Sequence, residues 1–351
     1  MKSPKKIIGY FGRRYGGKPF RIIRKICYDT ADFVQDVSEI MDIRRKRYPK
    51  DSEEEQFYNQ YYTESPGKTS KGGIICMYDG RIIHGGLTDR LRGLLTTYRE
   101  AKKRGIPFYI LWNSPFELSA YLEPAEVDWR IDESEISYAR EEAFPLIIQD
   151  LSFFNNKHRL DMALHDAKLQ THVYSNADNA IGEYASLFHE LFRPSSALQK
   201  HVDYHLEKLG SNYHAYTFRF LELLGDFTDF QKDTLSGKAL EDFAGRVIGE
   251  FKSRIDMLGD DVKILVTSDS KRFLDMAADI DSRIYIVPGE VKNIDLLKGE
   301  YPDAWMKTFI DQQLLMHASH VTLMITGKMY NSGFPRFAAE VGGAQYTIHR
   351  F

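Results

Sequence analysis

The chain has 351 residues, of which 43% are hydrophobic, enough to build the cores of roughly two domains. Its two cysteines, Cys27 and Cys76, exclude a disulfide framework and a cysteine-rich metal site, as is usual in a reducing cytoplasm. The net charge is -3, no run is as long as a transmembrane helix, and the first residues lack a signal-peptide core. We therefore expect a cytoplasmic protein, either soluble or peripheral on the inner face of the membrane.

The first segment, residues 1–72, is expected to form a basic amphipathic arm, a helix at 29–41 and a polar connector. Residues 1–28 contain nine lysines and arginines and no acidic residue, interleaved with isoleucine, tyrosine and phenylalanine. Such a segment suits the headgroup region of an anionic membrane, and a solvated terminus is the simpler alternative. Because we find no matching basic face in the rest of the chain, we expect no nucleic-acid partner.

Strands and helices alternate from residue 73 onward, which predicts a Rossmann-like, acceptor-side domain over 73–195. Gly85 and Gly86 precede a helix expected at 89–103, between strands at 73–78 and 107–112, and another strand is expected at 171–175. In α/β folds a glycine turn at a helix start presents backbone N–H groups to a phosphate or a sugar. An ordinary strand-to-helix crossover has the same pattern, so both interpretations stay open.

A second α/β domain is expected over 196–351, after a helix at 182–192 and together with a capped helix at 196–210. Its strands are expected at 213–220, 262–267, 283–287 and 321–325, and its helices at 237–258, 271–278, 304–317 and after 332. The chain is thus predicted to be an α/β protein with two Rossmann-like domains and mainly parallel sheets facing across a cleft. Ligands of such sheets bind beyond the carboxyl ends of the strands, so the loops after 220, 267 and 325 are the candidates for a site.

Arg219 stands near the end of an otherwise apolar predicted strand, where an unpaired guanidinium is unfavourable to bury. Its planar fork fits phosphate oxygens, which makes Arg219 the leading candidate for a phosphate ligand. The structural alternative is an internal ion pair with Glu222 or Asp226.

Two further loops carry candidate ligands. Ser268 and Asp269 follow the strand at 262–267, where a carboxylate can accept hydrogen bonds from a ribose or a base, although capping of the next helix explains the same residue types. Ser332 is expected to be the N-cap of the last helix, whose free N–H groups suit a diphosphate, and a well-capped structural helix is the alternative. Asp279 and Asp281 stand between a helix and a strand, where a turn needs aspartate, and the histidine pairs lack a third ligand, so we expect no metal site.

Together these segments resemble the fucosyltransferase superfamily that includes α-1,6-, α-1,2-, nodulation-type and protein O-fucosyltransferases. Residues 84–112 resemble the Gly-Leu-Asn/Asp-Arg-Leu helix of its amino domain, and 266–274 resemble a motif at the second strand of its donor domain. Arg219 matches the arginine of the His-x-Arg motif, and Ser332, Gly333 and Phe334 resemble the Ser-Ser/Gly-Phe motif. One residue departs from the pattern, because Thr217 stands where the family usually has histidine.

The resemblance implies a GT-B fold with GDP-fucose as the donor, no further cofactor, and an inverting transfer that needs no metal. It implies that Arg219 contacts the diphosphate, that Asp269 contacts the guanosine portion, and that residues 332–334 contact the phosphates. Asp311 matches an acidic position of the family that helps to hold the nucleotide. Gly85, Gly86 and the Asp89-Arg90 pair are then expected on the opposite wall, facing the transferred sugar and the acceptor.

Departure of GDP leaves negative charge on the β-phosphate, which Arg219 stabilises in this hypothesis. The acceptor hydroxyl needs a base, for which Asp89, Glu222 and Asp226 are the candidates. We therefore expect an enzyme that transfers fucose from GDP-fucose to a glycan, glycolipid or protein acceptor, such as a surface polysaccharide precursor. The alternatives are a GT-B glycosyltransferase that uses another nucleotide sugar, and a non-catalytic peripheral membrane or glycan-binding module.

Overall fold

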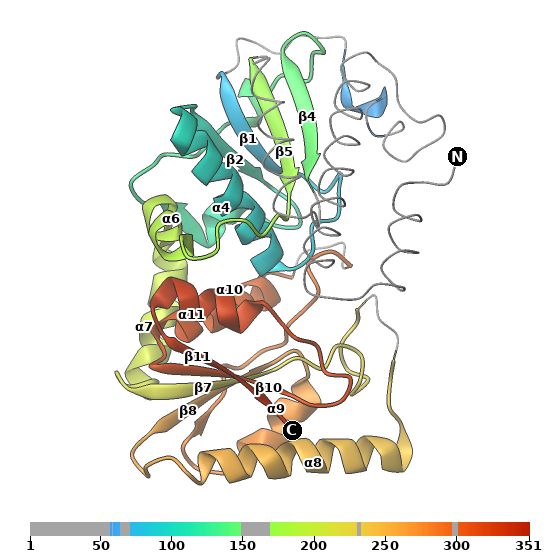
Figure 1. The fold of residues 1–351 in the computed structure, drawn as a ribbon, viewed down its shortest axis with the longest axis vertical. Coiled ribbons are helices and arrows are strands. Elements are labelled where there is room, and N and C mark those ends of the chain that lie inside the picture. The colour runs from blue at the N-terminus through green and yellow to red at the C-terminus, as the bar shows by residue number, and fades with distance from the viewer. Residues whose placement is uncertain (1–56, 58, 64–70, 149–168, 230–232, 297–300) are drawn as a thin grey trace, which may run out of the picture. The chain divides into compact units, whose positions relative to one another are not determined.

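The computed structural model describes residues 57, 59–63, 71–148, 169–229, 233–296 and 301–351 (Figure 1). The basic arm at 1–28, the helix expected at 29–41 and most of the connector lie outside the described residues. The chain divides into two compact units. Unit 1 contains Arg92–Leu111, Trp129–Asn179 and the residues up to Tyr78, and unit 2 contains Asp79–Leu91, Trp112–Asp128 and Ala180–Phe351. The ranges expected from the sequence, 73–195 and 196–351, are continuous, whereas these units are not.

Unit 1 is built on a four-stranded sheet in the order β2-β1-β5-β4. Its strands are β1 (Gly73–Tyr78), β2 (Phe108–Trp112), β4 (Ala143–Ile148) and β5 (Gln170–Ser175). Both β1 and β4 pair with β5 in parallel, and every residue of β5 is buried. The three predicted strands are confirmed. β4 was not predicted, since Pro145 interrupts its apolar run, and a proline is tolerated here because β4 lies at the edge of the sheet.

Helix α4 (Leu87–Arg104) confirms the helix predicted after the glycine turn. Its small residue Gly93 packs directly on the end of β5, because a Cβ atom at this position would overlap the backbone carbonyl of Ser175. The hydroxyl of Thr96 donates to the carbonyl of Ala177, 2.9 Å away. These contacts fix the middle of α4 against the chain that leaves β5.

Unit 2 is built on a five-stranded parallel sheet in the order β11-β10-β7-β8-β9. Its strands are β7 (Tyr213–Phe218), β8 (Lys263–Ser268), β9 (Ile284–Tyr285), β10 (His320–Ile325) and β11 (Gln345–Arg350). Read from β9 to β11, the chain order is 3-2-1-4-5, which is the Rossmann order. The strand order reverses between β7 and β10, and ligands of open parallel sheets bind at this switch point.

Six α-helices and a small antiparallel pair accompany this sheet in the described part of unit 2. The helices are α6 (Tyr184–Leu191), α7 (Ser196–Leu209), α8 (Gly237–Ile255), α9 (Lys271–Ala278), α10 (Pro302–His317) and α11 (Phe334–Gly342). Strands β3 (Leu122–Pro124) and β6 (Phe192–Pro194) pair antiparallel. Figure 1 shows α8 and α9 on one face of the parallel sheet and α10 and α11 on the other. The predicted helices are confirmed, including the cap of α7, where the Ser195 hydroxyl accepts from the Leu198 N–H.

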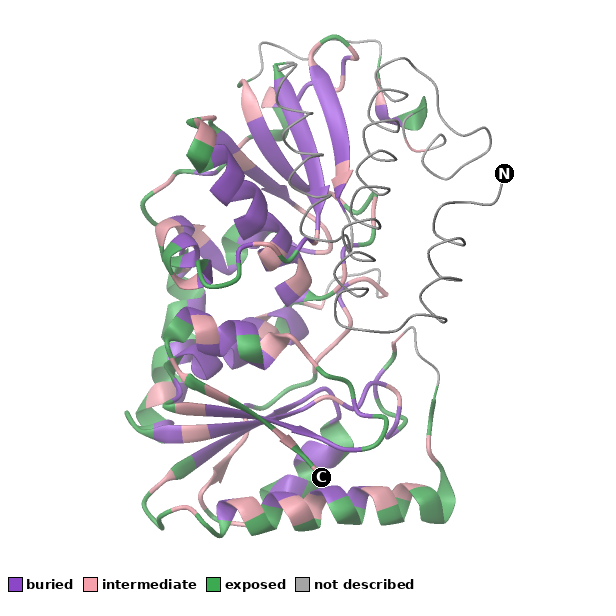
Figure 2. Cartoon of the chain, in the orientation of Figure 1, coloured by how far each residue is buried: buried purple, intermediate pink, exposed green. Residues whose placement is uncertain are grey.

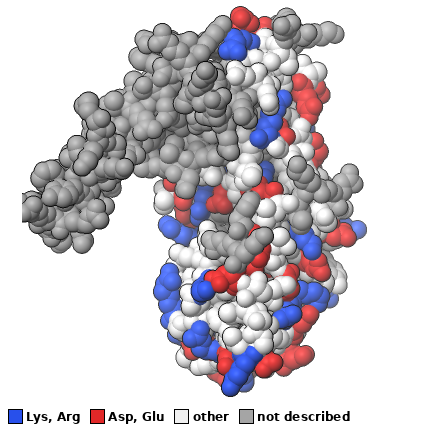
Figure 3. All heavy atoms as spheres, turned by 90° about the vertical axis from the view of Figure 1, so that its right-hand side faces the viewer, with Lys and Arg blue, Asp and Glu red and all other residues white. Residues whose placement is uncertain are grey.

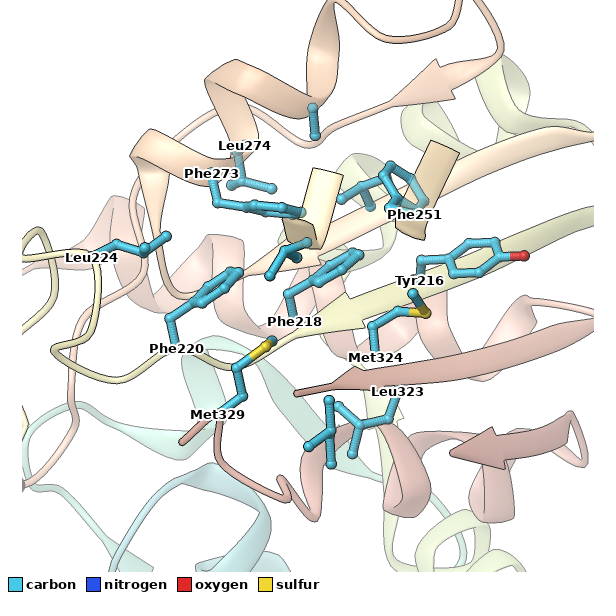
Figure 4. Close-up of a cluster of buried hydrophobic side chains, with 14 of the residues drawn as sticks. Tyr216, Phe218, Phe220, Leu224, Phe251, Phe273, Leu274, Leu323, Met324 and Met329 are labelled. Atoms are coloured by element: carbon cyan, nitrogen blue, oxygen red, sulfur yellow. The ribbon is translucent and has the colours of Figure 1, made fainter. Parts of the chain in front are cut away.

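The core beneath α8 and α9 is aromatic (Figure 4). The ring of Phe273 on α9 lies 4.3 Å from the ring of Phe218 and 4.9 Å from that of Phe220, between centroids. Burial of each such ring stabilises the folded state by about 1.5–3 kcal/mol, because its apolar surface is removed from water. Because alternate residues of an extended chain point to opposite sides, burial of Phe218 and Phe220 directs Arg219 away from this core.

Buried residues follow most of the strands and the inner helix faces, and exposed residues lie on the outer helix faces (Figure 2). On the face drawn in Figure 3, acidic and basic side chains are intermixed over the described residues. Among the described helices, none combines the length and apolar character needed to cross a membrane.

Candidate functional site

Arg219 directly follows β7 at the switch point of the unit 2 sheet. Its guanidinium lies 3.2 Å from Asp229 through Nη2 and 3.2 Å from Asp269 through Nη1. The ring of Phe227 supports the guanidinium from one side, with its centroid 4.6 Å from Cζ. The side chain is 24% exposed, so a cation in a fixed plane stays accessible to an anion. The alternative considered from the sequence, an ion pair with Glu222 or Asp226, is corrected: Arg219 pairs with Asp229 and Asp269.

Asp269, at the end of β8, organises the loop that follows β7. Its two carboxylate oxygens accept hydrogen bonds from the N–H groups of Phe220, at 2.9 Å, and of Leu221, at 2.7 Å. The side chain is 1% exposed; burial raises the pKa of Asp269, against the opposing effect of the Arg219 charge and of these N–H groups. Leu221 has a φ of 56°, a conformation that a side chain rarely adopts without such support.

Both Asp269 oxygens accept backbone N–H groups of the protein, so a contact of Asp269 with a ribose or a base stays a prediction. The alternative for this loop, capping of the next helix, is confirmed. The cap of α9 is Ser270, whose hydroxyl accepts from the Phe273 N–H at 3.1 Å. Ser268 accepts from the Ser270 N–H at 3.1 Å and thereby belongs to the same turn.

A cavity of about 480 Å³ opens beside this turn. It lies at the end of β8 and the start of α9, and the segment 289–292 forms another wall. Its lining combines apolar, acidic and basic side chains, namely Leu274, Met276 and Val291 with Asp226, Ser268, Asp269, Asp275, Glu290, Lys271, Arg272 and Lys292, next to Gly289. The volume falls within the range of small-molecule sites in proteins.

Each of the three candidate bases holds a turn in place. Asp226 accepts from the Arg272 N–H at 2.7 Å and from the Ser270 hydroxyl at 3.0 Å, at the start of α9. Glu222 accepts from the Asp229 N–H at 2.9 Å. Asp89 accepts from the Gly86 N–H at 3.1 Å. Asp226 is the one of the three that also lines the cavity.

The glycine turn binds the protein's own carboxylates. The Gly85 N–H donates to Asp295 at 2.5 Å, and the Gly86 N–H donates to Asp89. Arg90 donates to the carbonyls of Gly85 and Ser114, both at 3.2 Å, and forms a 2.5 Å ion pair with Asp295. The expectation that these N–H groups face a phosphate or a sugar is therefore wrong for this structure, because internal acceptors occupy them. Arg90 likewise supports the turn rather than presenting a free cation.

The loop after β10 lies against Arg219, since the Tyr330 N–H donates to the Arg219 carbonyl at 2.9 Å. Helix α11 begins at Phe334, so its N-cap is Gly333 and not Ser332. The Ser332 hydroxyl still accepts from the Phe334 N–H, at 3.2 Å. The structure thus brings the loop of residues 326–332 beside the phosphate-ligand candidate and shifts the predicted cap by one residue.

Two other positions singled out in the sequence are buried. Asp311 is enclosed in α10, where its carboxylate accepts from the Lys307 ammonium at 2.7 Å; burial raises its pKa, and Lys307 counteracts the shift. In the described part of the chain, the other Asp311 oxygen has no hydrogen-bond partner. Thr217, which replaces the family's histidine, accepts a hydrogen bond from Thr267 across β7 and β8, at 3.1 Å.

Sequence reasoning missed Asp229 and Asp295, two carboxylates that bind the arginines of the site. Asp229 stands in the polar stretch after Phe227, and Asp295 lies 205 residues after Arg90. Neither belongs to a motif, and no local periodicity marks them.

The architecture defines a GT-B-like α/β protein, with mainly parallel sheets and a partly exposed arginine at the switch point of one of them. Solved structures share this fold. NodZ α-1,6-fucosyltransferase soaked with GDP-fucose matches with a TM-score of 0.51 at 15% identity, over 77% of this chain and 93% of that one. Fucosyltransferase NodZ from Bradyrhizobium, as its selenomethionine form, matches with a TM-score of 0.50 at 17% identity, over 77% and 92%.

POFUT1 in complex with GDP matches with a TM-score of 0.46 at 11% identity, over 80% of this chain and 99% of that one. No model of a known protein family matches the chain, and no curated protein does. The chain therefore shares the fold of the two NodZ structures, in line with the GT-B fold expected from the sequence.

Proposed function

We propose that this chain is a glycosyltransferase that binds a nucleoside diphosphate sugar in unit 2, with GDP-fucose as the first candidate donor. The observation that carries the proposal is the position of Arg219 at the switch point between β7 and β10. A partly exposed guanidinium there can receive the diphosphate. The adjoining cavity of about 480 Å³ is the proposed nucleoside site.

The proposed chemistry needs little beyond positioned charge. When the bond between the anomeric carbon and the diphosphate breaks, negative charge collects on the leaving phosphate while the sugar becomes oxocarbenium-like. Arg219 stabilises that charge, and the loop of residues 326–332 lies beside it. In an inverting transfer the acceptor hydroxyl attacks from the opposite face and loses its proton to a carboxylate, for which Asp89, Glu222 and Asp226 stay the candidates.

Two of the matched structures are NodZ soaked with GDP-fucose and NodZ co-crystallized with GDP, which supports the choice of this donor for the first test. Thr217 in place of histidine is a specific reason to test other donors as well. Thermal denaturation with GDP, UDP, ADP and CDP is expected to show the largest stabilisation with GDP, because a ligand that binds the folded state raises the melting temperature. Hydrolysis of GDP-fucose, measured as released GDP, then tests turnover without knowledge of the acceptor. If none of the four nucleotides raises the melting temperature, the proposal is contradicted.

Peripheral association with an anionic membrane through residues 1–28 is part of the same proposal. Its support is the basic and apolar composition of that segment. Sedimentation with phosphatidylserine vesicles is expected for the full chain and not for a chain lacking residues 1–28. Equal sedimentation of the two chains contradicts it.

A further inference from the structure

Asp295 holds the glycine turn by both of its carboxylate oxygens. Oδ1 lies 2.5 Å from Nη2 of Arg90, and Oδ2 accepts from the Gly85 N–H at 2.5 Å. The side chains of Arg90 and Asp295 are 5% and 3% exposed, so the ion pair is almost completely withdrawn from water. A buried charge of this kind requires its partner, because loss of one leaves the other without compensation.

The same contacts leave Gly85 without conformational freedom. Asp295 binds its N–H, and Arg90 donates from Nε to its carbonyl at 3.2 Å. The residue has a φ of 88°, in the region that favours glycine. Protein groups thus bind both polar backbone atoms of Gly85 and support the turn on two sides.

A short segment connects this turn to the proposed phosphate ligand. The Asp295 N–H donates to the side-chain oxygen of Asn293 at 3.0 Å, and the amide nitrogen of Asn293 donates to Asp229 at 3.1 Å. Asp229 in turn binds Nη2 of Arg219 at 3.2 Å. Residues 293–295 thus contact the carboxylate beside Arg219 at one end and the glycine turn at the other.

We propose that Asp295 is a positioning residue of the donor site, which fixes the glycine turn through Gly85 and Arg90 and, through Asn293 and Asp229, the orientation of Arg219. The inference rests on the proposed function, since the donor site is itself proposed. It assigns Asp295 no contact with the donor. Its effect is to keep the turn and Arg219 in a fixed arrangement, and an error of about 1 Å in such an arrangement can cost about 100-fold in rate.

The test compares Asp295→Asn with Asp281→Asn in the full chain. Asp281 forms a 2.8 Å ion pair with Arg283 in the same unit, and neither residue contributes to the site. The Asp281→Asn variant therefore controls for the loss of an internal charge pair. Hydrogen exchange of peptides that cover 84–91 and the affinity for GDP are measured at neutral pH. Asp295→Asn is expected to speed hydrogen exchange in residues 84–91 at least about tenfold and to weaken GDP binding about tenfold. Asp281→Asn is expected to change neither the exchange rate nor the GDP affinity.

Unchanged exchange in Asp295→Asn overturns the proposal, because the turn then does not depend on this carboxylate. Faster exchange with unchanged GDP affinity also overturns it, because Asp295 then has a structural role only. Failure of the proposed function is recognised separately, in the wild-type chain. If that chain binds no nucleotide, the role of Asp295 toward a donor is lost, while the exchange data still decide whether it holds the turn.

Discussion

Asp269 and Arg219 stand at the ends of neighbouring strands, and each determines how the other is presented. The Asp269 carboxylate accepts two backbone N–H groups from the residues after Arg219 and pairs with its guanidinium at 3.2 Å. An acidic residue at the end of β8 thereby shapes the loop at the end of β7. This relationship explains how a cation can be fixed at a switch point while 24% of its side chain stays exposed.

Removal of the Arg219 side chain is expected to abolish most donor binding. Arg219→Ala should weaken the affinity for GDP by about 10- to 100-fold, because hydrogen bonds to charged groups contribute about 1.5–3 kcal/mol. Titration calorimetry measures the affinity, and circular dichroism checks that the variant is folded. Arg193→Ala is the control, since that side chain on β6 is largely exposed. Affinity within twofold of the wild type removes Arg219 from the proposed site.

Asp229 competes with a bound phosphate, because it occupies Nη2 of Arg219. Asp229→Asn removes its charge and is expected to tighten GDP binding about two- to fivefold at low salt, as a partly exposed ion pair is worth about 1 kcal/mol or less. The gain should shrink at high salt, where such interactions are screened. The amide oxygen of the variant can still accept from Arg219 and Asn293 and so orient the guanidinium. Weaker binding by the variant therefore contradicts the competition and shows that this orientation needs the carboxylate charge.

Loss of the Asp269 carboxylate is expected to destabilise unit 2. Asp269→Ala leaves the N–H groups of Phe220 and Leu221 without their acceptors, and each such buried group costs about 1–3 kcal/mol. We expect the free energy of unfolding in urea to fall by about 2–4 kcal/mol, and by about half as much in Asp269→Asn, which retains one acceptor. Asp275→Asn, at an exposed ion pair of α9, should change it by less than about 0.5 kcal/mol.

Two glycines predict opposite effects of the same substitution. Gly85→Ala is expected to lower the free energy of unfolding by about 1–2 kcal/mol, because its φ is 88° and a Cβ atom would lie 2.7 Å from Oδ2 of Asp89. Gly245 lies in α8, where no atom would contact the new methyl group. Gly245→Ala should therefore raise the free energy of unfolding by about 0.4–1 kcal/mol. Urea denaturation of both variants checks the signs. A neutral Gly85→Ala contradicts the strain assigned to the turn.

The Asp281 and Arg283 pair predicts a pH dependence of stability. Hydrogen bonds from the Arg283 side chain and backbone lower the pKa of Asp281 from 3.8 to about 2. Because the folded pKa lies below the unfolded one, the stabilisation is complete above pH ~4 and is lost as the pH falls through 2. Asp281→Asn should be less stable than the wild type at pH 7 by at most about 2 kcal/mol and equally stable below pH ~1. A difference that persists below that pH contradicts this origin.

Most elements were predictable because their signals are local. Apolar runs marked β1, β7, β8 and β10, and caps such as Ser195 marked helix starts. β11 was missed since it is a largely exposed edge strand, whose sequence has no continuous apolar run. Edge strands bury little side-chain area, so selection of apolar residues in them is weak.

The sequence by itself determined the alternation of strands and helices, the resemblance to fucosyltransferases and the choice of Arg219 as a candidate phosphate ligand, because a charge near the end of an apolar strand stands out locally. Only the tertiary structure decided what each polar group binds. It assigned Asp269 and Asp295 to backbone N–H groups and arginines far away in the chain, and it gave the N–H groups of Gly85 and Gly86 internal acceptors. The physical reason is that buried charges must find partners, and those partners come from whichever segments the sheet order brings together.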